Sequence, residues 1–214
     1  MIQLNTIVPL PLKDKLLQRP SDIWNKNLSF NEGEWIKIKA PSGTGKTTFI
    51  HSLYALRTDY DGAILWNNKN LKSYSTTDLA TLRQQEVSIV FQDLRLFPQL
   101  TAKENIQINS VLQEPYCKEE VIDNMAEQLG ITHILLQKAG ICSYGEQQRI
   151  AIIRALVQPF KWLLMDEPFS HLDEANTQKA TQLIASECAK RNAGIILTDL
   201  EDESHFEYSR KLNL

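Results

Sequence analysis

Short apolar runs alternate with amphipathic stretches along most of the 214-residue chain. Runs rich in Val, Ile, Leu and Trp predict strands, and apolar residues repeated every three or four positions predict helices. We expect strands at residues 2–8, 27–30, 35–40, 63–66, 87–91, 161–166 and 194–198. We expect helices at residues 45–57, 78–85, 145–157 and 174–191. Asp61 and Gly62 are typical turn residues and predict a turn before the strand at 63.

The order of these elements predicts an α/β fold. Strands that alternate with helices indicate a mostly parallel sheet. Residues 93–140 differ, because Val121, Met125 and Leu129 follow helical spacing and strand-like runs are few. We therefore expect a single domain over residues 1–214, in which 1–92 and 141–214 form an α/β core and 93–140 form a helical subdomain.

Composition limits the possible functions. Hydrophobic residues make up 43% of the chain, which is enough for a large core. The net charge is −3 and no run of Lys or Arg marks a surface for nucleic acid. The three cysteines show neither paired nor metal-type spacing, which indicates a reducing compartment. No stretch reaches 18 consecutive apolar residues, so we expect a soluble chain that reaches a membrane only through a partner.

The stretch from Ala40 to Thr48 reads Ala-Pro-Ser-Gly-Thr-Gly-Lys-Thr-Thr and lies between a predicted strand and a predicted helix. It matches the phosphate-binding loop pattern G-x-x-x-x-G-K-[ST] except at Ala40. Alanine costs more than glycine there only if the position needs a positive φ or a close backbone approach. Lys46 is placed to reach the β- and γ-phosphates, and Thr47 to offer its hydroxyl to Mg²⁺. The candidate nucleotide-binding residues of this loop are Ser42, Gly43, Thr44, Gly45, Lys46, Thr47 and Thr48.

Two carboxylates follow a second apolar run. Residues 162–165 lead directly into Asp166 and Glu167, which places both acids at the carboxyl end of a strand, where parallel sheets bind ligands. Asp166 is expected to hold Mg²⁺, and Glu167 to orient the attacking water in phosphoryl transfer. Gln92 directly follows another buried strand and is a candidate contact for Mg²⁺ or the water. The alternatives are an ordinary turn before a helix for the loop and an acidic cap after a strand for the two carboxylates.

Residues 142–149 read Cys-Ser-Tyr-Gly-Glu-Gln-Gln-Arg and open an apolar helix. Here the chain resembles the ATP-binding cassette (ABC) ATPases, whose signature is Leu-Ser-Gly-Gly-Gln/Glu. The resemblance also covers the phosphate loop, Gln92, the two carboxylates and residues 170–173. It implies a P-loop NTPase of the ABC nucleotide-binding type, with a mostly parallel core sheet, a small antiparallel part and a helical subdomain. In that family two cassettes dimerise head to tail, so Ser143 and Gly145 would bind the partner's nucleotide.

Residues 97–101 and 104–106 narrow the resemblance to the branch of lipoprotein-releasing, macrolide-export and cell-division cassettes. This implies ATP and Mg²⁺ as cofactors, a second cassette that is either identical or different, and a separate integral membrane permease. It also implies a cytoplasmic location on the inner face of the cell membrane, and no nucleic-acid partner.

The chain departs from the family pattern at several positions. Tyr144 stands where the first signature glycine is expected, and Asp199 where the family has a histidine that contacts the γ-phosphate. Residues 1–23 contain no aromatic residue to stack on adenine, and Trp24, the nearest one, is expected to pack at the start of a strand. His205 is expected to be a surface or packing residue.

These observations predict an ATP-hydrolysing subunit of a membrane transporter, with Glu167, Lys46 and Gln92 as catalytic residues and Thr47, Gln92 and Asp166 as metal ligands. The departures keep a second hypothesis open, a nucleotide-binding module with little or no turnover. A chromosome-type cassette needs a long coiled-coil insertion that the interval between loop and signature does not have. A small-molecule kinase has no reason to carry the signature.

Overall fold

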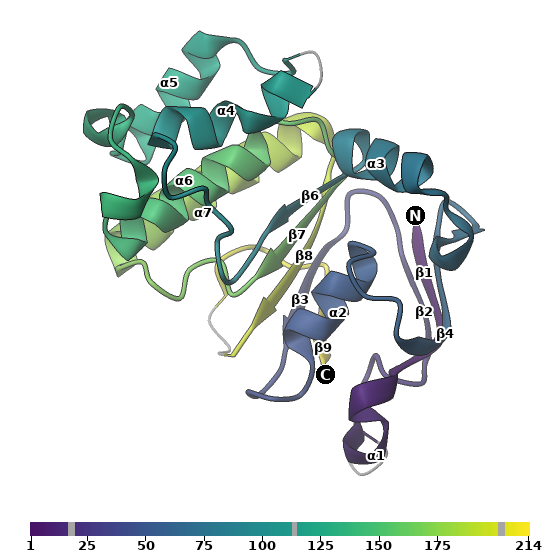
Figure 1. The fold of residues 1–214 in the computed structure, drawn as a ribbon. Coiled ribbons are helices and arrows are strands. Elements are labelled where there is room, and N and C mark those ends of the chain that lie inside the picture. Colours follow the sequence, from purple (N-terminus) through teal and green to yellow (C-terminus); the bar gives the residue numbers. More distant parts are fainter. Residues whose placement is uncertain (17–19, 113–114, 201–203) are drawn as a thin grey trace.

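The computed structural model describes residues 1–16, 20–112, 115–200 and 204–214, and within them a five-stranded parallel sheet forms the centre of the fold (Figure 1). The strand order is β6-β7-β8-β3-β9, and every neighbouring pair is parallel. The strands are β6 (Val87–Val90), β7 (Trp162–Asp166), β8 (Gly194–Asp199), β3 (Trp35–Lys39) and β9 (Arg210–Asn213). Because all five strands are parallel, their carboxyl ends meet at one edge of the sheet.

A smaller antiparallel sheet lies beside the parallel one, with the order β2-β1-β4-β5. Its strands are β2 (Asn27–Phe30), β1 (Ile2–Pro9), β4 (Tyr60–Trp66) and β5 (Lys69–Asn70). The turn predicted at Asp61 and Gly62 is wrong, because both residues lie inside β4. Gly62 has a φ of +80° where the register between β1 and β4 shifts, and a Cβ there would lie 2.4 Å from the carbonyl oxygen of Asn5. The position is therefore a β-bulge that requires glycine.

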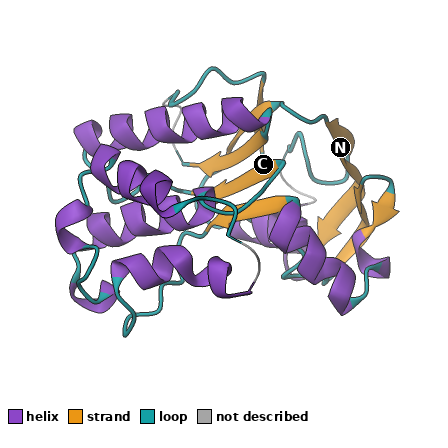
Figure 2. Ribbon diagram, turned by 90° about the horizontal axis from the view of Figure 1, so that it is seen from above, coloured by secondary structure: helices purple, strands orange, loops and turns teal. Residues whose placement is uncertain are grey.

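Helices cover both faces of the parallel sheet. α6 (Tyr144–Leu156) and α7 (Glu174–Arg191) pack on one face, and α2 (Lys46–Leu53) lies on the other, between the two sheets (Figures 1 and 2). The apolar residues of β7 alternate between the two cores: Leu163 and Met165 pack with the α6 side, and Leu164 packs with the α2 side. A strand buried on both faces explains the unbroken apolar run in the sequence.

The remaining helices cluster at the α6 side or bridge the two sheets. α4 (Ala102–Leu112) and α5 (Glu119–Gln128) pack on α6, and α3 (Thr76–Gln85) packs against β6. α1 (Lys13–Leu16) and the short 3₁₀ turns complete the helical elements of the described chain. The turns are Leu10–Leu12, Leu71–Ser73, Thr132–Ile134 and Ala139–Ile141. The predicted fold class, an α/β protein with a parallel core, an antiparallel part and a helical part, is confirmed.

Several elements differ from the sequence prediction; β4 begins at Tyr60 instead of residue 63, and α3 begins at Thr76 instead of residue 78. α2 ends at Leu53 instead of continuing to residue 57, because Ala55 adopts a left-handed φ of +58° that stops the helix. β9 was not predicted, since its polar residues, half-buried and exposed in alternation, carry no apolar run. In the described ranges, no helix combines the length and the apolar character needed to cross a membrane.

Candidate nucleotide-binding site

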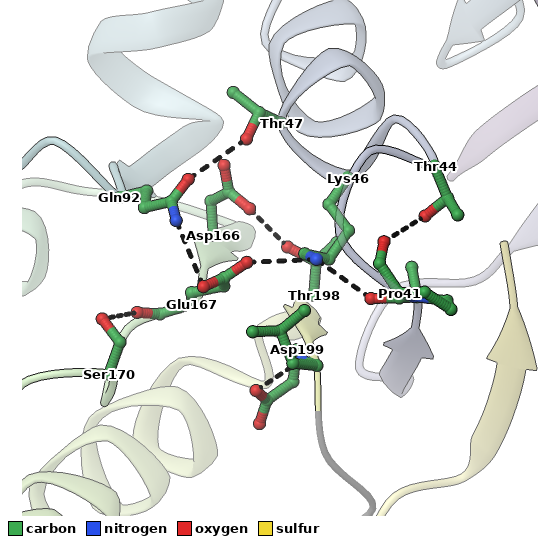
Figure 3. Close-up of polar contacts among 12 residues, drawn as sticks. Pro41, Thr44, Lys46, Thr47, Gln92, Asp166, Glu167, Ser170, Thr198 and Asp199 are labelled. Carbon is green, nitrogen blue, oxygen red and sulfur yellow. Dashed lines mark hydrogen bonds and ion pairs between the residues drawn. The ribbon is translucent and has the colours of Figure 1, made fainter.

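The candidate site lies at the carboxyl edge of the parallel sheet. β3 leads into the phosphate loop and α2, β6 leads to Gln92, and β7 ends at Asp166, which Glu167 follows (Figure 3). β8, between β7 and β3, ends at Asp199. Chemically active residues from four separate segments therefore converge because the strands that carry them are parallel neighbours.

The phosphate loop accepts alanine in place of its first glycine. Ala40 is fully buried, does not adopt a positive φ, and donates its N–H to the carbonyl oxygen of Asp199 at 3.0 Å. The left-handed positions are Gly43, with a φ of +77°, and Gly45, with a φ of +102°. A Cβ on Gly45 would also lie 2.9 Å from Leu12, so glycine is needed there for space as well as conformation. The substitution at Ala40 therefore adds no backbone strain.

The rest of the loop is also ordered by local contacts. Thr44 is buried, and its hydroxyl donates to the carbonyl oxygen of Pro41 at 2.7 Å. Ser42 is exposed at the tip, and Thr48 lies in the first turn of α2. Trp24 is buried with an edge-on contact to a phenylalanine of α2, and its ring nitrogen donates to the carbonyl oxygen of Thr44 at 3.4 Å. Trp24 is thus a packing residue, but it packs against the phosphate loop and α2 instead of the start of a strand, where the sequence predicts it.

Lys46 contacts both the phosphate loop and the carboxylate of Glu167. Its ammonium group donates to the carbonyl oxygen of Ala40 at 2.9 Å and lies 3.1 Å from Oε1 of Glu167. The side chains of Lys46 and Glu167 are only 7% and 11% exposed. The charge of Lys46 is therefore neutralised by the carboxylate of Glu167 in a largely buried ion pair.

Gln92 connects the loop to the same glutamate. The hydroxyl of Thr47 donates to Oε1 of Gln92 at 3.4 Å, and Nε2 of Gln92 donates to Oε2 of Glu167 at 3.1 Å (Figure 3). Glu167 has a positive φ of +48°, an uncommon and strained conformation for a residue with a side chain, and its N–H donates to the carbonyl oxygen of Thr198 at 3.0 Å. Strained residues of this kind cluster at functional sites.

Asp166 presents a carboxylate oxygen without a partner. The side chain is 1% exposed, and its Oδ1 accepts a hydrogen bond from the hydroxyl of Thr198 at 2.7 Å. Oδ2 is buried and has no hydrogen-bond partner among the described residues. A buried carboxylate oxygen is costly unless a cation or donor meets it. Together with the side-chain oxygens of Thr47 and Gln92, it forms a set of hard oxygen donors that fits Mg²⁺.

No group of three or more His, Cys, Asp or Glu side chains within the described ranges is arranged to hold a metal ion by itself. Mg²⁺ commonly uses one or two carboxylates and takes its other ligands from water and substrate phosphates. A single carboxylate with two neutral oxygens therefore fits a cation that arrives with a nucleotide.

The signature residues lie at the start of α6, apart from this cluster. Ser143 is the N-cap of α6; its hydroxyl donates to Oε2 of Glu146 at 2.8 Å and accepts from the N–H of Glu146 at 3.4 Å. The hydroxyl and the N–H of Ser143, which donates to the same Oε2 at 2.8 Å, hold the pKa of Glu146 below its usual range. Tyr144 is half-exposed and packs on the ring of His171 with centroids 4.1 Å apart, and a Cβ on Gly145 would lie 3.1 Å from the carbonyl oxygen of His171. The structure does not bring Ser143 and Gly145 to the phosphate loop of the same chain.

Asp199 is not an unpaired acid. Its Oδ2 lies 3.7 Å from the ammonium group of Lys37 and 3.6 Å from Nε2 of His205. Lys37 is 2% exposed although it is in the middle of β3, and the ring of His205 packs on Phe169. A cavity of about 810 Å³ is lined by Glu167, Asp199 and His205 among others. His205 is thus a packing residue, as predicted, but it also faces the cavity that contains Glu167.

Sequence reasoning did not single out Lys37. The signal was present, because a lysine within an apolar strand of a central sheet needs an oppositely charged partner when it is buried. The partner could not be found from the sequence, since Asp199 lies more than 150 positions later and becomes a neighbour only through the pairing of β3 with β8.

The strand–loop–helix unit, its buried lysine and the acids at the next strand ends define a P-loop nucleoside triphosphate-binding protein. Residues 23–170 match the family model described as ABC transporter. The chain is 36% identical over 173 residues to the lipoprotein-releasing system ATP-binding protein LolD of Legionella pneumophila (strain Lens), which covers 80% of this chain and 76% of LolD. This chain belongs to the ABC transporter family, as an ATP-binding subunit.

Two further comparisons agree. The chain is 33% identical over 193 residues to the putative hemin import ATP-binding protein HrtA of Staphylococcus haemolyticus (strain JCSC1435), covering 88% of this chain and 85% of HrtA. The fold matches the dimeric structure of MJ0796, a bacterial ABC transporter cassette, with a TM-score of 0.79 over 94% of this chain and 88% of that chain, at 24% identity. The resemblance inferred from the motifs is confirmed.

Proposed function

We propose that this chain hydrolyses ATP and thereby drives a separate integral membrane permease. The observation that carries the proposal is the chain of contacts at the sheet edge, in which Lys46 meets Glu167 and Gln92 joins Glu167 to Thr47. The unpartnered carboxylate oxygen of Asp166 lies at the end of β7, the neighbour of β6, which leads to Gln92. This arrangement supports a phosphate cradle, a cation site and a carboxylate that lie side by side, as phosphoryl transfer requires.

Each residue has a proposed task. The backbone of residues 42–48 and the start of α2 bind the phosphates, and Lys46 contacts the β- and γ-phosphates. Mg²⁺, held by Thr47, Gln92 and Asp166, neutralises phosphate charge when it is bound. Glu167, released from Lys46 by the incoming phosphate, accepts a hydrogen bond from the attacking water and orients it. Gln92 then reports the presence of the γ-phosphate to the helical part.

The second half of the site is proposed to come from another cassette, identical or different. Ser143 and Gly145 present a helix N-terminus that suits the γ-phosphate of the partner's nucleotide. We propose that residues 1–214 act as one domain, with 93–140 as its helical subdomain, on the inner face of the cell membrane beside the permease. LolD is named as part of a lipoprotein-releasing system, and a comparable task for this chain is a proposal.

A second candidate is a nucleotide-binding module with slow or no turnover. The observations that favour it are the acid at position 199 and the hydroxyl of Ser143, which is already engaged by Glu146. Three acids, Glu167, Glu174 and Asp199, line the same cavity, and although Lys46 and Lys37 pair with two of them, their negative charge disfavours a phosphate there.

Steady-state phosphate release from Mg-ATP tests the proposal. The wild-type protein is expected to release phosphate, and Glu167→Gln is expected to bind ATP without releasing it. Glu86→Gln is the matched control, because Glu86 also loses an ion pair, with Lys161 at 2.9 Å, but lies at the opposite ends of the strands. Bound ATP without release by the wild type would favour the second candidate, and absence of ATP binding would contradict both.

A further inference from the structure

The segment that follows Gln92 has an unusual backbone. Leu94 and Arg95 are consecutive left-handed residues, with φ values of +57° and +47°. Residues with side chains avoid this conformation, and two in a row persist only where the surroundings hold them. Two backbone hydrogen bonds close the turn. The N–H of Leu94 donates to the carbonyl oxygen of Phe91 at 3.1 Å, and the N–H of Arg95 donates to the carbonyl oxygen of Asp93 at 2.6 Å.

Arg154 holds this segment from α6. One terminal nitrogen of its guanidinium donates to the carbonyl oxygen of Arg95 at 2.8 Å, and the other donates to the carbonyl oxygen of Leu94. Both left-handed residues are therefore held by one forked donor. Burial lowers the pKa of Arg154 to about 10, so it remains a cation at neutral pH. Hydrogen bonds from a charged donor are about twice as strong as neutral ones.

α6 also contacts the segment that follows Glu167. The side chain of Gln148, near the middle of α6, donates to the carbonyl oxygen of Pro168 and accepts from the N–H of His171 at 3.1 Å. The same helix begins at Ser143. One helix thus contacts both the Gln92 segment and the segment after Glu167.

We propose that Arg154 is a positioning residue for ATP hydrolysis, because it holds the strained Leu94 and Arg95 so that the Gln92 side chain spans Thr47 and Glu167. The inference rests on the proposed function only for its effect on turnover. Arg154 touches no reacting group and acts through Gln92.

Amide hydrogen exchange without nucleotide tests the structural step. Arg154→Lys keeps the charge but replaces the fork by a single-point donor. We expect the amides of Leu94 and Arg95 to exchange about ten-fold faster in this variant, with the β7 amides unchanged. The control is Arg210→Lys, which alters an arginine on β9 that donates to the carbonyl oxygen of Ser29. Equal exchange at Leu94 and Arg95 in the two variants would overturn the proposal.

A kinetic cycle tests the link to Gln92. Arg154→Lys is expected to lower kcat for phosphate release about ten-fold, with the KM for ATP little changed, since misplaced catalytic groups act on the rate. In a Gln92→Ala background, Arg154→Lys is expected to have no further effect. Additive effects would show that Arg154 does not act through Gln92. If the wild type releases no phosphate, the proposed function fails, and the exchange experiment still decides whether Arg154 holds the segment.

Discussion

Replacing Glu167 by glutamine is expected to tighten ATP binding while it abolishes turnover. In the structure, Oε1 of Glu167 lies 3.1 Å from the ammonium group of Lys46, the group that we propose binds the phosphates. At an effective dielectric constant of about 20, this separation corresponds to a gross attraction of about 5 kcal/mol. Desolvation offsets much of it, and a hydrogen bond to a charged group contributes about 1.5–3 kcal/mol net. ATP has to overcome this net term before it binds Lys46.

Glutamine keeps the size of the side chain and its hydrogen bonding but removes the charge. We therefore expect the Kd of Glu167→Gln for ATP to be about ten-fold lower than that of the wild type, which corresponds to about 1.4 kcal/mol. Titration calorimetry without Mg²⁺ measures this directly and avoids hydrolysis. The Glu86→Gln control is expected to bind like the wild type. An unchanged or weaker affinity of Glu167→Gln would refute the competition between Glu167 and phosphate for Lys46.

Three further predictions concern stability, which urea unfolding measures, and the last of them also concerns phosphate release. Gly62→Ala should lower the free energy of unfolding by about 3 kcal/mol, because the new Cβ would lie 2.4 Å from a carbonyl oxygen. Gly43 has a similar φ but lies in open space, so Gly43→Ala should lower the free energy of unfolding by about 1 kcal/mol. Equal losses in the two variants would contradict the assignment of Gly62 to a β-bulge. Ser143→Ala should cost about 1 kcal/mol at pH 7. The cap lowers the pKa of Glu146 from 4.5, so its contribution to the free energy of unfolding is present above pH 4.5 and is lost as the pH falls through the lowered pKa. The difference in stability between Ser143→Ala and the wild type should therefore become smaller in acid. A difference that does not change with pH would argue against the cap. Ala40→Gly should leave phosphate release unchanged and lower stability by up to about 1 kcal/mol, and a stabilised variant would contradict an unstrained alanine.

Much of the fold was predictable because local rules and tertiary packing agree. The α7 helix begins at the Asp173 cap and ends at a left-handed Asn192, and its predicted bounds are the observed ones. β7 is an apolar run that is buried on both faces. Where the local signal is ambiguous, prediction fails: Asp61-Gly62 suits a turn as well as a bulge, and only the pairing with β1 decides between them.

The residues of the candidate site could be predicted from the sequence, but the contacts between them could not. Lys46, Gln92 and Glu167 follow from motif spacing, whereas the ion pair between Lys46 and Glu167 depends on β7 lying two strands from β3. The compensation of Asp199 by Lys37 likewise depends on strand order. Contacts between distant segments are set by topology, and a single sequence carries little information about them.

The central claim, a site completed by a second molecule, is tested most directly by mixing two inactive variants. Ser143→Asp keeps a good N-cap but places a negative charge at the proposed anion site, and Glu167→Gln removes the carboxylate that is proposed to orient water. Each variant alone is expected to release no phosphate. In a head-to-tail dimer of the two, one site has an intact Glu167 and an intact Ser143, so an equimolar mixture should recover about a quarter of wild-type phosphate release. A mixture that remains inactive, or a Ser143→Asp variant with full activity by itself, would contradict the account.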